Sequence, residues 1–310
     1  MPSRLTLLLP ARDRFGDAPL PSDLGRALAR SDTGMEAVGG KAQIQRHVQA
    51  IPAHAPAAAI SRHVDAEGAE QQAWLRADPA WVRVDINGGR MLACGEMGLT
   101  HDEAQALIEP LRTLFGDEGF PISAPTPSRW YLMLPRESKL PAFDPPEDVL
   151  GDDLVGHLPA GNEGRRWRRL LNEAQVLLHN HPLNERRIAH GKPPVNSLWF
   201  WGGGVLPDFV RCEARVHSDD VLVHGLLKIA KIAPKPVPTR FESSLRDGTC
   251  VVDLRRQREL PKLHGDWLLP AIAALRAGDE LRLDCSDGAQ YRLRRSQRWR
   301  FWRGSARTWP

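Results

Sequence analysis

Hydrophobic residues along this chain recur with two different periods, and the two alternate from one segment to the next. From residue 163 to 178 they return every three or four residues, which predicts an amphipathic helix. Its apolar face holds Trp167, Leu170, Leu171, Ala174, Leu177 and Leu178. Short apolar runs predict strands at residues 5–9, 81–86, 91–94, 129–134, 195–201, 250–254, 281–285 and 291–293. Because strands and helices alternate, we expect an α/β fold with a mostly parallel sheet covered by helices.

Capping and turn residues place several boundaries of these elements. Thr100 with Glu103 three residues later forms a capping box, which predicts a helix to about Phe115. Residues 87–89, Asn-Gly-Gly, predict a hairpin turn between two strands. The Pro-rich stretch 121–127 is typical of an irregular connector, since proline lacks a backbone donor.

Two further segments alternate with a period of two. Residues 210–216 predict one strand with Val210 and Val216 on its apolar face. Near the end of the chain, Trp299 and Phe301 alternate with arginines, which predicts an edge strand guarded by positive charge.

The elements group into two parts. Residues 81–134 contain a β-β-α-β unit that can form a small layer of its own. We therefore expect residues 1–54 and 136–310 to form the main α/β core, and residues 55–135 a smaller inserted or flanking α/β subdomain.

Composition narrows the class of protein. Of the 310 residues 42% are hydrophobic, which suits a globular chain, and the net charge is +4. The longest apolar run near the start is too short to span a membrane. The four cysteines are scattered, which argues against a disulfide framework or structural zinc. A cytoplasmic protein without a cofactor or membrane partner is expected, and its oligomeric state is left open.

Candidate chemistry is densest between residues 179 and 204. Three glycines follow a buried apolar run and leave backbone N–H groups open to a ligand, while nearby arginine and lysine supply cations. We predict a site for a small anionic metabolite, formed by Asn184, Arg187, Lys192, Asn196, Trp201, Gly202, Gly203 and Gly204. The alternative is a tight glycine turn with the cations on a solvated face.

Two other kinds of site are weighed against this one. His179 and His181, with His190 nearby, are candidates for a metal site, but a histidine at a helix end also meets the helix dipole favourably. The basic aromatic segment at residues 294–303 suits single-stranded nucleic acid by residue type. Without a recognised binding motif, nucleic acid is not favoured as a partner.

The same block carries a resemblance. Residues 184–196, Asn-x-x-Arg-x-x-x-Gly-Lys-x-Pro-Val-Asn, run into Trp-Phe-Trp-Gly-Gly-Gly at 199–204. This order resembles a signature of the archaeal-type cofactor-independent phosphoglycerate mutases. The whole chain also resembles the RpfE-type regulatory proteins of proteobacteria, through residues 7–10, 158–163, 171–175, the block above and 298–302.

The mutase resemblance implies the alkaline-phosphatase superfamily, with two divalent metals on Asp and His ligands and a phosphorylated Ser. The first strand of such a protein ends in Asp-Gly, whereas here it runs into Pro10, Ala11 and Arg12, and no Asp-His dipeptide occurs. We therefore expect a degenerate mutase-like core in a non-catalytic regulatory or binding protein. The alternatives are a metal-dependent phosphoglycerate mutase-like phosphotransferase and a protein-interaction scaffold.

Overall fold

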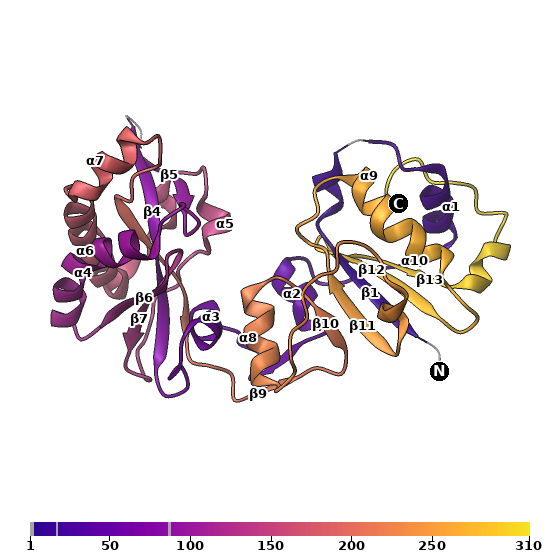
Figure 1. Cartoon of the computed structure of the whole chain (residues 1–310), viewed down its shortest axis with the longest axis horizontal. Coiled ribbons are helices and arrows are strands. Elements are labelled where there is room, and N and C mark those ends of the chain that lie inside the picture. The colour runs from indigo at the N-terminus through magenta and orange to yellow at the C-terminus, as the bar shows by residue number, and fades with distance from the viewer. Residues whose placement is uncertain (1–2, 17, 86–87) are drawn as a thin grey trace. The chain divides into compact units, whose positions relative to one another are not determined.

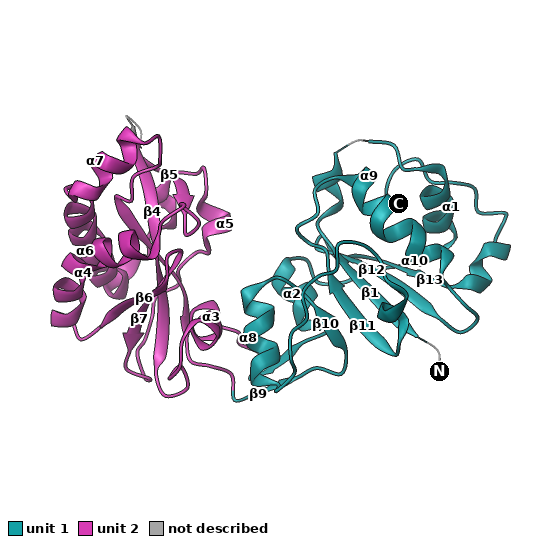
Figure 2. Ribbon diagram, viewed as in Figure 1, with its two compact units in different colours: residues 1–53, 208–310 teal, residues 54–207 magenta. Residues whose placement is uncertain are grey.

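The structure is a computed structural model that describes residues 3–16, 18–85 and 88–310 (Figure 1). The chain divides into two compact units (Figure 2). Unit 1 comprises residues 1–53 and 208–310, and unit 2 comprises residues 54–207. No helix among the described residues is both long and apolar enough to cross a membrane.

Unit 1 is built on a six-stranded sheet with the order β10-β11-β1-β12-β13-β2. Its strands are β1 (Arg4–Leu9), β2 (Asp32–Met35), β10 (Arg215–His217), β11 (Thr249–Asp253), β12 (Glu280–Cys285) and β13 (Ala289–Leu293). The first four strands in that order are parallel, and β13 and β2 continue the sheet antiparallel. The carboxyl ends of the four parallel strands therefore share one edge of the sheet.

Helices and short connections surround this sheet. They are η1 (Arg12–Phe15), α1 (Ser22–Arg30), α2 (Gly40–Gln45), α8 (Val221–Ile229), η3 (Ser243–Arg246), α9 (Leu260–Leu263), the π-helical turn η4 (His264–Leu268), α10 (Leu269–Ala273) and η5 (Arg295–Trp299). A separate antiparallel pair joins β3 (Gln49–Ile51) to β9 (Phe209–Arg211). Leu5 and Leu7 of β1 pack with Leu24 of α1 and Trp267 of η4 in a buried core, because alternate residues of a strand face the same side.

Unit 2 has a five-stranded sheet in which all pairings are antiparallel. Its strands are β4 (Ala73–Asp85), β5 (Gly88–Cys94), β6 (Ile122–Thr126), β7 (Arg129–Leu134) and β8 (Ser197–Gly204). The long strand β4 pairs with β5, β7 and β8, so it is the centre of the sheet.

Helices cover both faces of the unit 2 sheet. They are α3 (Ala57–Asp65), α4 (His101–Asp117), α5 (Pro146–Val149), η2 (Leu154–His157), α6 (Gly161–His179) and α7 (Pro182–Ala189). Leu107 of α4 and Trp167 of α6 pack in one cluster with Leu75 of β4. Trp74, the neighbour of Leu75 and hence on the opposite face, packs against Ala58 of α3.

The α/β fold class is confirmed, with the parallel strands in unit 1. The first boundary between the units lies one residue from the expected position, after Ala53. The second lies after Pro207 rather than after residue 135, because α6 and β8 pack on β4 and complete the core of unit 2.

Most of the expected elements are confirmed, including β1, β7, the capped helix α4 and the hairpin of β12 with β13. Leu177 is an exception within α6, since its side chain is exposed. The turn residue Asn87 lies outside the described residues. The connector expected at 121–127 contains strand β6, in which Pro125 is accommodated at an irregular, edge position of the sheet.

Two strand predictions are wrong. Residues 210–216 do not form one strand but contribute to two, β9 and β10, which belong to different sheets. The segment around Trp299 forms the 3-10 helix η5, and the side chains of Trp299 and Phe301 are exposed. Alternation of apolar and basic residues there reflects exposure of both kinds of side chain rather than a half-buried strand.

Candidate functional site

The block singled out by the sequence lies on α7, β8 and the loop between them, in unit 2. Asn184 is buried, and its amide donates to Leu178 O over 2.7 Å and to Val195 O over 2.9 Å. Its Oδ1 accepts from Val195 N over 2.8 Å. Asn184 thus fastens the end of α6 to the start of β8, which are elements on either side of α7.

Arg187, like Asn184, is buried and uses its polar atoms to hold neighbouring segments of unit 2 together. Only 1% of this residue is exposed. Its guanidinium donates from Nε to Pro193 O over 3.0 Å, from Nη2 to Met97 O over 2.7 Å, and from Nη1 to the Glu103 carboxylate over 3.0 Å. A buried guanidinium is stable only when its donors are satisfied in this way.

Asn196 and Trp201 pair with the central strand of unit 2. The Asn196 side chain accepts from Val82 N over 2.8 Å and donates to Val82 O over 2.7 Å, as a neighbouring strand would. The Trp201 indole donates to the Asp78 carboxylate over 2.7 Å, and its ring stacks under the guanidinium of Arg76. Complete burial raises the pKa of Asp78, although Arg76, Trp201 and backbone donors oppose that shift.

The three glycines permit close packing within unit 2. Gly202 has φ +66°, and a Cβ there would lie 2.9 Å from Ala57 Cβ on α3. A Cβ on Gly204, with φ +147°, would lie 2.9 Å from Pro56 Cβ. The glycines extend β8 and let the start of α3 approach it, which only a residue without a side chain allows.

Lys192 differs from these residues, because it is exposed and borders a pocket of about 520 Å³. The pocket is lined by Asp102, Glu103, Ala106, Leu183, Arg186, Arg187, His190 and Lys192. Within the described part of the chain, neither Arg186 nor Lys192 has a carboxylate partner. Of the residues that the sequence assigned to anion binding, Arg187 and Lys192 line this pocket, and ligand binding there stays a prediction.

Among the residues that the structure describes, the candidate metal histidines belong to no group of three or more His, Cys, Asp and Glu side chains that could hold a metal ion. His181 caps α7, with Nδ1 accepting from Leu183 N over 3.2 Å, and His179 is the exposed last residue of α6. His190 Nδ1 lies 2.7 Å from Arg186 O, to which it donates as the Nδ1–H tautomer.

The carboxyl edge of the parallel strands in unit 1 was missed from the sequence, although acidic residues follow each strand. At the end of β11, Arg255 donates to the Asp253 carboxylate from Nε over 2.8 Å and from Nη2 over 2.7 Å. It also reaches Asp220 over 3.0 Å. Ser218 Oγ donates to Asp253 over 2.8 Å. Burial raises the pKa of Asp253, but the Arg255 and Ser218 contacts outweigh burial, so the pKa lies below its usual value.

Asp–Arg ion pairs also lie at the carboxyl ends of strands β12 and β1. Arg46 donates to the fully buried Asp284 carboxylate over 2.6 Å, and Arg12 donates to Asp287 over 2.6 Å. Gln43 of α2 donates to Leu9 O over 3.0 Å and to Asp284 O over 2.5 Å, which ties α2 over the strand ends. The edge where ligands of open α/β sheets bind is thus occupied by Asp–Arg pairs.

These Asp–Arg pairs decide whether the residues at the strand ends fit the two divalent metals that the mutase resemblance implies. Among residues 3–16, 18–85 and 88–310 no group of three or more His, Cys, Asp and Glu side chains could hold a metal ion. The carboxylates at the strand ends are neutralised by guanidinium groups rather than gathered around a shared centre. The described residues therefore do not fit the two divalent metals of the mutase resemblance.

No protein-family model matches the chain. Among curated proteins it is 32% identical over 159 residues to a 2,3-bisphosphoglycerate-independent phosphoglycerate mutase of Methanosarcina barkeri, across 50% of this chain and 40% of the relative. It is 37% identical over 106 residues to a probable mutase of the same name from Geobacter sulfurreducens, across 34% and 26%. The matched segments thus span less than half of these relatives.

Two solved structures align along nearly the full chain. A cofactor-independent phosphoglycerate mutase from Thermoplasma acidophilum aligns with a TM-score of 0.43 at 12% identity, over 95% of this chain and 90% of that one. A protein from Pyrococcus horikoshii aligns with a TM-score of 0.47 at 12% identity, over 94% and 88%.

The sequence relatives correct the expected function. We expected a non-catalytic regulatory protein, but the similar curated proteins are mutases by name. The prediction of a non-catalytic regulator is therefore wrong against these comparisons, and the mutase-like alternative is better supported. A distant resemblance to the cofactor-independent phosphoglycerate mutases is established from the sequence.

Proposed function

We propose that this chain is a phosphoglycerate mutase-like phosphotransferase that takes a phosphorylated small acid. Its support is the sequence similarity to curated mutases, together with a cationic pocket beside the block that carries the mutase-like signature. The resemblance to the RpfE-type proteins and a cytoplasmic location stay predictions.

The single observation that carries the binding step is the pocket of about 520 Å³ bordered by Arg186 and Lys192. Arg187 and Glu103 neutralise each other at its wall, so Arg186 and Lys192 supply the free positive charge, against one exposed carboxylate, that of Asp102. A guanidinium binds phosphate or carboxylate in a bidentate manner, and an ammonium binds either as a point charge. A phosphorylated small acid offers both kinds of anion.

His190 and Leu183 complete the assignment of roles. The bond from His190 Nδ1 to Arg186 O fixes the ring, which orients the last turn of α7 at the pocket rim. Leu183 lines the pocket with an apolar side chain. This apolar surface suits the carbon skeleton of a small substrate better than it suits a second anionic group of that substrate. In this assignment these residues bind and orient the substrate.

The binding step is tested with 3-phosphoglycerate as the probe, titrated calorimetrically into the full chain. We expect Arg186→Ala/Lys192→Ala to weaken binding by about tenfold or more, the usual loss for charge-assisted hydrogen bonds. The matched control is Arg14→Ala/Arg165→Ala, which removes two exposed arginines elsewhere. Equal affinity in the wild type and the pocket variant would overturn the assignment. Arg187 and Asn196 are unsuitable for this test, because their side chains hold the fold together.

A further inference from the structure

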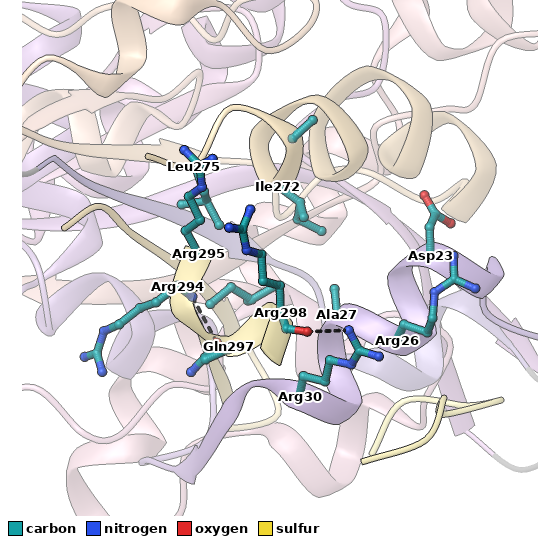
Figure 3. Close-up of a pocket in the computed structure, with 12 residues that line it drawn as sticks. Asp23, Arg26, Ala27, Arg30, Ile272, Leu275, Arg294, Arg295, Gln297 and Arg298 are labelled. Carbon is teal, nitrogen blue, oxygen red and sulfur yellow. Dashed lines mark hydrogen bonds between the residues drawn. The ribbon is translucent and has the colours of Figure 1, made fainter. Parts of the chain in front are cut away.

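A second pocket, in unit 1, has a different composition. Its volume is about 480 Å³, and five arginines line it: Arg26, Arg30, Arg294, Arg295 and Arg298. Figure 3 shows Arg26 and Arg30 approaching from α1 and the other three from the segment after β13. One carboxylate, that of Asp23, also lines the pocket, and it accepts from His264 Nε2 over 3.0 Å.

Most of this positive charge has no acidic partner. Arg294 is paired, since it donates to Glu280 over 2.5 Å, and its side chain extends away from the others (Figure 3). Arg26, Arg295 and Arg298 are exposed and have no carboxylate partner in the described ranges of the chain. Arg30 Nε is a buried atom without a hydrogen-bond partner there. Grouped unpaired guanidiniums repel one another, and an anion between them removes that cost.

The Arg30 guanidinium and the main chain that carries Arg294, Arg295 and Arg298 are held in place by hydrogen bonds. Arg30 donates to Arg298 O over 2.9 Å, which ties α1 to η5. Gln297, which is buried, accepts from Arg294 N over 2.9 Å and donates to Arg292 O over 3.1 Å. Figure 3 shows Arg295 and Arg298 reaching from this fixed turn toward the helix that carries Ile272. Positions fixed before binding lower the ordering cost of a ligand.

The pocket is separate from the strand-end edge of unit 1. Leu293, the last residue of β13, pairs with Leu281 near the start of β12, so this pocket lies at the amino edge of the parallel strands. Apart from Gln297, its remaining walls are apolar, from Ala27, Ile272, Ala273, Leu275 and Leu293. The pocket thus combines a face of guanidiniums, carried on α1 and on a fixed turn, with an apolar floor.

We propose that this pocket binds an oligophosphate group, the compact and multiply charged anion that several convergent arginines recognise best. Planar guanidiniums match phosphate oxygens bidentately, and one ligand with several phosphates reaches more than one arginine at once. The group comes either from an inorganic oligophosphate or from a nucleoside polyphosphate whose apolar part lies on the floor. The site is independent of the phosphorylated-acid pocket in unit 2.

The test is calorimetric titration of the full chain at low salt with inorganic tripolyphosphate and, separately, with ATP. We expect the wild type to bind at least one of them, and Arg26→Gln/Arg298→Gln to lose about tenfold or more in affinity. The control Arg14→Gln/Arg165→Gln removes the same charge and should bind as the wild type does. Lys192→Ala should also bind normally, which separates this site from the unit 2 pocket.

Comparing the two ligands shows whether the oligophosphate group is inorganic or belongs to a nucleotide. Tighter binding of ATP than of tripolyphosphate would mean that the organic part of the nucleotide contacts the apolar floor. The proposal is overturned if neither ligand binds, if both double variants lose affinity equally, or if a single-stranded oligonucleotide binds more tightly than tripolyphosphate. Citrate, a polyanion without phosphate, should bind more weakly than tripolyphosphate; equal binding would also contradict it. Removing these arginines breaks no ion pair found among the described residues, so the variant is expected to fold.

Discussion

The Arg187 guanidinium donates to the Glu103 carboxylate over 3.0 Å and joins helix α7 to the first turn of helix α4. The same carboxylate oxygen accepts from Thr100 N over 2.9 Å as part of the capping box. One oxygen therefore starts α4 and anchors the segment that carries the mutase-like signature. The pair explains how an arginine at this position is stable although it is buried.

Replacing Arg187 by alanine should destabilise unit 2. The change leaves Met97 O and Pro193 O without their donor and Glu103 without its cation, which is expected to lower the free energy of unfolding by about 3 kcal/mol. Urea unfolding followed by tryptophan fluorescence measures it. The exposed Arg165→Ala is the control and should change stability by less than about 0.5 kcal/mol. Similar losses in the two variants would contradict the account.

Gly202 and Gly191 form a matched pair for testing the packing of β8 against α3. Both have positive φ, +66° and +69°, so alanine at either position costs about 1 kcal/mol in backbone strain. A Cβ at Gly202 also meets Ala57 Cβ at 2.9 Å, whereas nothing lies within 4 Å of one at Gly191. Gly202→Ala should therefore lose about 1–3 kcal/mol more than Gly191→Ala in urea unfolding. If the two alanine variants were equally stable, the close contact would have no energetic role.

The strand-end carboxylate of Asp253 predicts how stability changes with acid. Burial by itself would raise the pKa of Asp253. The hydrogen bonds and positive charge of Arg255 lower the pKa by more than burial raises it, so the folded pKa lies below the ordinary 3.8. The unfolded chain then takes up a proton first as the pH falls. The contribution of Asp253 is full above the unfolded pKa and is lost as the pH falls through the folded one.

Asp253→Asn should therefore be less stable than the wild type near neutral pH, and the gap should narrow on acidification. Thermal unfolding at about pH 6 and about pH 3 measures the two gaps. A gap that stays constant or widens in acid would show that the carboxylate charge is not what Arg255 and Ser218 stabilise.

Elements set by local sequence could be predicted. The run 129–134 matches β7, because its apolar residues are continuous and buried, and Thr100 with Glu103 marks the start of α4. The predictions failed where pairing outside the segment decides the outcome. Pro125 stands in β6 because the edge of a sheet does not need its missing N–H, a position that no local pattern reveals.

The sequence predicted where the candidate site lies better than it predicted what the residues of the site do. The sequence located the block around Arg187 and Lys192, and the structure places both at one pocket. It did not show that Arg187 is held by Met97 O, a partner 90 residues away. The pair of Arg46 with Asp284, 238 residues apart, was missed for the same reason. Burial forces such side chains to find partners, and those partners are set by the tertiary fold.

The most direct test of the proposed function is ³¹P NMR of the full chain incubated with 3-phosphoglycerate, in parallel samples with and without Mg²⁺, a divalent metal that is diamagnetic. We expect a 2-phosphoglycerate resonance to appear in at least one sample. We also expect the rate to fall in Arg186→Ala/Lys192→Ala but not in Arg14→Ala/Arg165→Ala. Absence of 2-phosphoglycerate from the wild-type samples under both conditions would contradict the proposed function.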